Sequence, residues 1–87
     1  MRVGSTEIAQ MQKSVHSEQY KKVLDWLIAA RKDAGLTQQQ VADQLGKPQS
    51  FVAKYEGGER RLDIVEFVEI SRVLGADAGD AIGLATQ

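Results

Sequence analysis

The sequence predicts an all-α domain of about five short helices. Apolar residues recur at spacings of three and four, which is the period of a helix buried on one face. Nearly every expected helix follows a residue that can cap it and ends at a glycine. The capping residues are Ser17, Thr37, Asp63 and Asp77, and the glycines are Gly35, Gly46, Gly57 and Gly75. No segment has the alternating pattern of a strand.

The first two helices have the clearest signals. After Ser17, one face of the first helix carries Tyr20, Val23, Leu24, Leu27, Arg31 and Ala34. The second helix begins at Thr37, which with Gln40 has the spacing of a capping box, and runs to about Leu45. Its buried stripe is Val41, Ala42 and Leu45, and Ala42 is small enough to let another helix approach closely.

The remaining helices follow from Pro48 onward. Proline favours the first helical turn, so the third helix is expected over about Pro48–Glu56. The fourth is expected from the Asp63 cap to Gly75, with a core face of Ile64, Phe67, Ile70, Ser71 and Leu74 that is widened by Val65, Val68 and Val73. Asp77 is expected to cap a last short helix through Ala81, Ile82 and Leu84.

A chain of 87 residues supports one domain. Residues 1–16 are interpreted as a weakly ordered arm or short helix, in which Ile8, Met11 and Val15 have helical spacing. Residues 17–84 form the expected domain and residues 85–87 a tail.

The composition excludes most catalytic chemistry. There is no cysteine and only one histidine, His16, so neither a thiolate or histidine metal site nor a Ser-His-Asp system can be assembled. We therefore expect that the protein is not an enzyme and that it holds neither a cofactor nor a metal. The longest apolar stretch, Trp26–Ala30, is far shorter than the roughly 20 residues that span a bilayer. The expected location is the cytoplasm, with no membrane partner.

The charge is unevenly distributed along the chain. Residues 1–61 hold ten basic and seven acidic side chains (+3), whereas residues 62–87 hold one basic and five acidic ones (−4), which gives the total of −1. An acidic C-terminal segment can therefore hide a locally positive face, which a polyanion would meet. Ordinary solvated charge explains the same counts equally well.

Two short helices joined by a tight turn containing glycine are typical of a helix-turn-helix unit. On a helical projection of residues 48–56, Val52 and Tyr55 point inward, whereas Gln49, Ser50, Ala53 and Lys54 form the outer face. That face carries no carboxylate and suits base edges and phosphates. The alternative is a solvated helix surface. Glu56 turns inward, and a buried carboxylate requires a partner.

Further polar residues flank these helices. Gln38 begins the second helix, where free amides favour a phosphate, although it fits equally well as an ordinary helix-start glutamine. Arg60 and Arg61 follow the third helix where a duplex backbone would pass, or they are solubilising loop charges. Lys47 lies in the turn and can also reach a phosphate.

These residues resemble the lambda-repressor-like, or XRE-type, helix-turn-helix domains of bacterial and phage regulators. The resemblance covers about Tyr20–Ile82 and is carried by Leu36-Thr37-Gln38, Val41-Ala42, Leu45-Gly46, Gln49-Ser50-Phe51-Val52 and Tyr55-Glu56. It implies that Gln49, Ser50 and Lys54 face the bases, that Gln38 holds a phosphate and supports its neighbour, and that Arg31 pairs with Glu56. Pro48 departs from the pattern, since a capping Ser or Thr is usual there.

The expected function is sequence-specific binding of double-stranded DNA as a small transcriptional regulator, in the role of a repressor. Gln49, Ser50 and Lys54 are expected to contact bases, and Gln38, Lys47, Arg60 and Arg61 the backbone. We expect a homodimer on an inverted repeat, because one copy makes few phosphate contacts. The alternative is a protein-interaction module, such as an antitoxin or adaptor, that binds through the arm or the last two helices.

Overall fold

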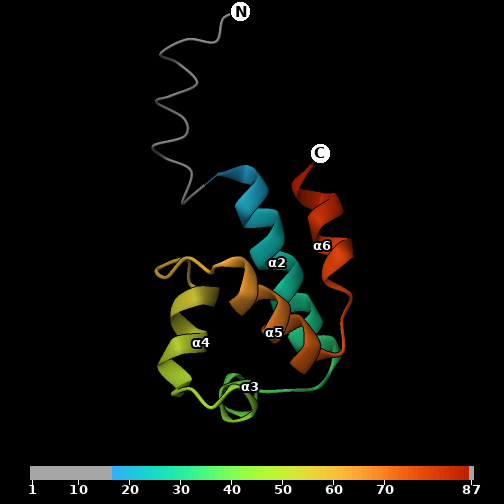
Figure 1. Ribbon diagram of the computed structural model, residues 1–87. Helices are drawn as coiled ribbons and strands as arrows, with labels where there is room; N and C mark the ends of the chain where they lie inside the picture. Colours follow the sequence, from blue (N-terminus) through green and yellow to red (C-terminus); the bar gives the residue numbers. More distant parts are fainter. Residues whose placement is uncertain (1–16, 87) are drawn as a thin grey trace, which may run out of the picture.

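The computed structural model describes residues 17–86, which fold into five helices without a strand (Figure 1). They are α2 (Glu18–Asp33), α3 (Gln38–Leu45), α4 (Gln49–Glu56), α5 (Ile64–Leu74) and α6 (Ala78–Ala85). The all-α prediction is therefore confirmed. The expected arm, residues 1–16, lies outside the described residues, as does Gln87 of the expected tail.

The capping residues begin four of the helices at the predicted positions. The Tyr20 amide donates to Ser17 Oγ at the start of α2 (3.1 Å). Thr37 and Gln40 form both hydrogen bonds of a capping box, and Asp77 accepts from the Gly79 amide. Asp63 forms a second complete capping box with Glu66. These local bonds satisfy amides that a helix leaves free in its first turn.

Helix α4 begins differently. Pro48 is its N-cap, with extended backbone and no side-chain cap hydrogen bond, and the helix starts one residue later at Gln49. The turn before it depends on Gly46, which caps the end of α3 at φ 69°, in the left-handed region that favours glycine. Helices α3 and α4 are therefore joined by a turn of three residues, 46–48.

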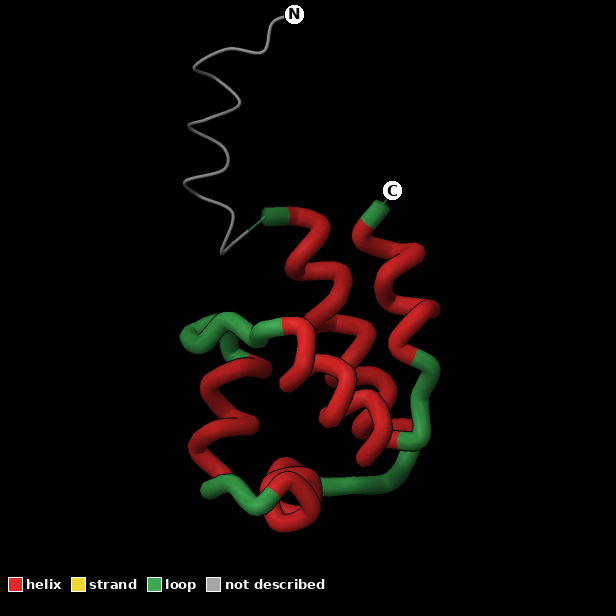
Figure 2. The backbone as a smooth tube through the Cα atoms, in the orientation of Figure 1, coloured by secondary structure: helices red, strands yellow, loops and turns green. Residues whose placement is uncertain are grey.

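The core lies where the five helices meet. Helix α2 packs along α6, α3 packs against α4, and α5 contacts α2, α3 and α6 from the centre (Figures 1 and 2). The buried apolar residues are Leu24, Leu27, Val41, Ala42, Val52, Tyr55, Phe67, Ile70, Leu74 and Ala81. Ala42 is fully buried, as a small residue between closely packed helices should be.

Four residues on predicted core faces are exposed: Ala34 at the end of α2, and Ile64, Val65 and Val68 on α5. Ile64, the first residue of α5, is 65% exposed, because none of the described helices covers its side chain. Ala34 is exposed because α2 ends at Asp33 and Ala34 is already the C-cap. Helix α6 also extends to Ala85, one residue past the predicted end of the domain. None of the helices in residues 17–86 is both long and apolar enough to cross a bilayer.

Candidate DNA-binding surface

The surface is built on α4, which the core holds in one orientation. Val52 and Tyr55 are almost completely buried. Their burial places Gln49, Ser50 and Lys54 on the exposed side, as the helical projection predicts. All three side chains are polar, and Lys54 adds a positive charge.

A continuous chain of hydrogen bonds connects the first residue of α4 to the interior. Gln49 Nε2 donates to Gln38 Oε1 (2.8 Å), and Gln38 Nε2 donates to Glu56 Oε1 (2.9 Å). Glu56 in turn accepts from Arg31, with Nε at 2.8 Å from Oε2 and Nη2 at 3.1 Å from Oε1. Helices α2, α3 and α4 are thus joined through four side chains, which we call the glutamine relay: Arg31, Glu56, Gln38 and Gln49.

The relay fixes which way both amides point. An ionised Glu56 can only accept hydrogen bonds, so Gln38 must direct its nitrogen toward it. The Gln38 oxygen then faces Gln49, whose nitrogen must donate. Within residues 17–86, no hydrogen bond engages Gln49 Oε1 or the second hydrogen of its amide, which lie at the exposed N-terminal end of α4.

The ion pair at the inner end of the relay is largely removed from solvent. The side chains of Arg31 and Glu56 are only 13% and 6% exposed. The hydrogen bond to Glu56 raises the pKa of Arg31 above its ordinary value, so the guanidinium stays charged. Arg31 Nη1 also donates to the Leu36 carbonyl (2.9 Å), which fixes the loop between α2 and α3.

Three further basic side chains, Lys47, Arg60 and Arg61, lie on aromatic rings. Arg60 stacks over Phe51, with 4.8 Å between Cζ and the ring centroid, and Lys47 Nζ lies 5.6 Å from the same centroid. Arg61 stacks over Tyr20 at 4.6 Å. These cation–π contacts place Lys47 and Arg60 beside α4, whereas Arg61 lies against α2.

Arg60 is also held by an acidic partner. Its Nη2 lies 2.8 Å from Glu66 Oε2 and its Nη1 2.9 Å from Glu66 Oε1, a bidentate pair. The hydrogen bond from Arg60, and then that from the Asp63 amide, lower the pKa of Glu66. Glu66 therefore stays ionised and competes with any phosphate for Arg60.

Comparison with known proteins agrees with this geometry. A family model described as helix-turn-helix matches residues 27–80, which is more than half of the chain. A solved structure, an XRE-family like protein from Pseudomonas syringae pv. tomato str. DC3000, has 42% sequence identity and a TM-score of 0.78. The match covers 87% of this chain and 93% of that one.

The chain belongs to the XRE-type helix-turn-helix family. In general terms it is therefore a DNA-binding transcription regulator. The search of curated proteins found no match.

In this XRE-type domain, Ser50 and Lys54 are exposed on α4, and the other residues selected from the sequence fall into three groups. Gln38, Gln49, Arg31 and Glu56 meet in the relay, Lys47 and Arg60 meet on Phe51, and Arg61 lies apart on Tyr20. Sequence reasoning missed Phe51 as a platform and Glu66 as the partner of Arg60. The Asp63-x-x-Glu66 spacing of a capping box was the available signal for Glu66.

Proposed function

We propose that the protein binds one DNA sequence with α4 in the major groove and represses transcription there. The observation that carries the proposal is the free edge of Gln49. Adenine presents an N6 donor and an N7 acceptor side by side in the major groove. The Oε1 acceptor and the N–H donor of Gln49 match that pair. The glutamine relay fixes the orientation of the Gln49 amide before any DNA is bound.

Ser50 and Lys54 extend the base-reading surface in this proposal. Both are exposed on the same side of α4 as Gln49. A serine hydroxyl can donate or accept, and a lysine ammonium donates to guanine O6 and N7. The bound site is therefore expected to contain adenine opposite Gln49 and guanine within reach of Lys54.

The phosphate contacts are assigned to Gln38, Lys47, Arg60 and Arg61. Gln38 still has one amide hydrogen after donating to Glu56, and it lies in the first turn of α3, where backbone amides are free. Lys47 and Arg60 flank α4 on the Phe51 ring, which suits contacts to one DNA strand. Arg61 is exposed on the Tyr20 ring and is assigned to a more distant phosphate.

We further propose a homodimer that reads an inverted repeat. Val65 and Val68 are 63% and 36% exposed on α5, and we call them the α5 ridge. A two-fold axis through the α5 ridge would bury both valines of each copy. Half-sites one helical turn apart require recognition helices about 34 Å apart.

Selection from a random duplex pool at ~100 mM salt tests the proposal. We expect an enriched inverted repeat, and Val65→Glu should reduce it to a single, weakly retained half-site. Ala29→Glu adds the same charge at an exposed position of α2 and should leave the inverted repeat intact. Retention without any enriched sequence would contradict specific readout, and a half-site from the unmodified chain would contradict the dimer.

Release of Arg60 from Glu66 is expected to strengthen DNA binding. Glu66→Gln keeps the capping box, which accepts glutamine at this position, but removes the charge that holds Arg60. The affinity should rise at low salt, and the slope of log affinity against log salt should steepen by about one unit for one added phosphate contact. Fluorescence anisotropy over a salt series measures both quantities.

Asp80→Asn is the matched control for Glu66→Gln, because it removes one negative charge from an exposed position on α6. Only Glu66→Gln should steepen the slope. Equal slopes for the two variants would mean that Arg60 contacts no phosphate.

A further inference from the structure

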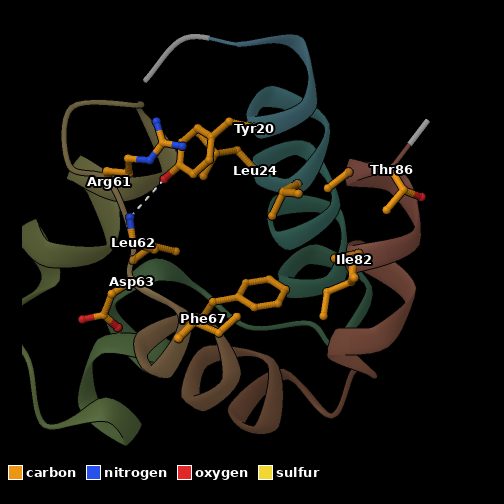
Figure 3. A pocket seen from close by; sticks show the side chains of 12 residues that line it. Tyr20, Leu24, Arg61, Leu62, Asp63, Phe67, Ile82 and Thr86 are labelled. Atoms are coloured by element: carbon orange, nitrogen blue, oxygen red, sulfur yellow. Dashed lines mark hydrogen bonds between the residues drawn. The ribbon is translucent and has the colours of Figure 1, made fainter. Parts of the chain in front are cut away.

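An apolar groove lies on the side of the domain formed by the first turns of α2, the start of α5, and α6 (Figure 3). Its volume is about 360 Å³, and side chains that line it include Tyr20, Leu24, Phe67 and Ile82. Two of its lining residues, Ile82 and Ile64, are 52% and 65% exposed. Large apolar side chains that are exposed to this extent in a small domain indicate a binding surface.

The walls of the groove are held in place by hydrogen bonding and stacking. The Leu62 amide donates to the Tyr20 hydroxyl (3.1 Å), which fastens the loop before α5 to the first turn of α2. Arg61, which also lines the groove, stacks on the Tyr20 ring with 4.6 Å between Cζ and the centroid. The groove therefore has a defined shape before anything enters it, which lowers the entropic cost of binding.

We propose that residues 1–16 of the same chain fill this groove as a short helix, with Ile8, Met11 and Val15 inserted. These three side chains share one face of a helix and span about 10 Å along its axis, at 1.5 Å per residue. Residues 1–16 also join the domain beside the groove, because Val15 is two residues before Ser17 and Tyr20 lines the groove.

The backbone conformation of Ser17 permits the chain to change direction between residues 1–16 and α2. Ser17 is extended (φ −64°, ψ 156°) and caps α2 with its side chain, so α2 begins at Glu18 and Ser17 is not part of the helix. The chain can therefore turn at this point toward α6. Thr86, at the end of the described chain, lines the same groove, which places its mouth between the two ends of the domain (Figure 3).

The chain's own segment fits the groove better than a second copy does. A tethered segment is present at millimolar effective concentration, which a separate molecule reaches only in concentrated solution. Residues 1–16 contain two basic and one acidic side chain, opposite in sign to the −4 of residues 62–87 that form two walls of the groove. The α5 ridge, proposed above for the dimer, does not line the groove, so both contacts can exist together.

Paramagnetic relaxation tests the proposal on the full chain. Because the sequence has no cysteine, Gln12→Cys provides a single site for a nitroxide label on the flank of the expected helix. We expect the label to suppress the amide signals of Leu62, Ile82 and Ala85. A label at Gln44→Cys, an exposed position of α3 whose residues do not line the groove, should leave these three signals stronger than the Gln12 label does.

Two further samples locate the contact. Ile82→Glu should abolish the suppression by placing a charge in the groove, whereas Val65→Glu, outside the groove, should preserve it. Both residues are exposed, and unchanged dispersion of the core amides verifies that each variant is folded. The proposal is overturned if the three signals keep their intensity in the Gln12-labelled chain, or if Ile82→Glu leaves the suppression unchanged. It is also overturned if suppression arises only between labelled and unlabelled molecules in a mixed sample, which would assign the groove to a second copy.

Discussion

Arg31→Ala is expected to destabilise the domain by about 3 to 5 kcal/mol, a large part of the ~5–15 kcal/mol that stabilises a typical protein. The substitution removes the ion-pair partner of Glu56, whose side chain is only 6% exposed in the folded protein, and leaves Gln38 as its remaining side-chain donor. It also removes the hydrogen bond that Arg31 donates to the Leu36 carbonyl. Urea denaturation followed by circular dichroism measures the loss.

The neighbouring residue provides the control for this prediction. Lys32 is exposed in the last turn of α2, so Lys32→Ala should change the stability by no more than about 0.5 kcal/mol. A loss below about 1 kcal/mol for Arg31→Ala would place the pair among surface ion pairs, in conflict with its burial. Glu56→Gln should cost less than Arg31→Ala, because a neutral amide leaves no buried charge unpaired on the Glu56 side and can still accept from Arg31.

Replacing both partners separates folding from DNA recognition. A buried ion pair exchanged for apolar residues of similar volume is often neutral or stabilising. The double variant Arg31→Met, Glu56→Leu should therefore recover most of the stability lost by Arg31→Ala. It should not recover the preference for one DNA sequence. A leucine side chain in place of Glu56 offers no acceptor to orient the Gln38 amide, and Gln38 then no longer fixes which way the Gln49 amide points.

Local signals in the sequence were sufficient to predict most of the helix boundaries. A capping pair such as Thr37 and Gln40 acts over three residues, and its geometry depends on nothing outside the turn. Helical periodicity likewise placed Val52 and Tyr55 inside and turned Glu56 inward. The partner of Glu56 is 25 residues away, however, and came from the resemblance to the family and not from the spacing.

Helical periodicity did not predict the burial of a side chain where that burial depends on whether another helix covers it. Ile64 lies on the apolar side of α5, but its side chain stays exposed at the edge of the groove. The groove itself is lined by side chains from α2, α5 and α6, and no local pattern specifies how these three helices meet. The Arg60–Glu66 pair was missed for a related reason, since the loop between α4 and α5 has no regular period from which to infer direction.

Gln49→Ala is expected to weaken binding to the preferred DNA site by about 1 to 3 kcal/mol, or about 5- to 150-fold. The loss should be specific to one base position in each half-site, where the variant should accept other bases. Titration of duplexes substituted at each position measures both effects. Unchanged affinity and unchanged base preference would remove Gln49 from the base-reading surface.

Two further variants separate a contact to the DNA backbone from the orienting effect of the glutamine relay. Lys47→Ala removes an expected phosphate contact. It should lower the affinity for all duplexes about equally and reduce the slope of log affinity against log salt by about one unit. Gln38→Ala removes the acceptor that fixes the Gln49 amide, without touching the edge that faces the bases. If orientation by the relay is what makes Gln49 selective, Gln38→Ala should relax the same base position as Gln49→Ala. A uniform loss across all duplexes would instead assign Gln38 to the phosphate alone.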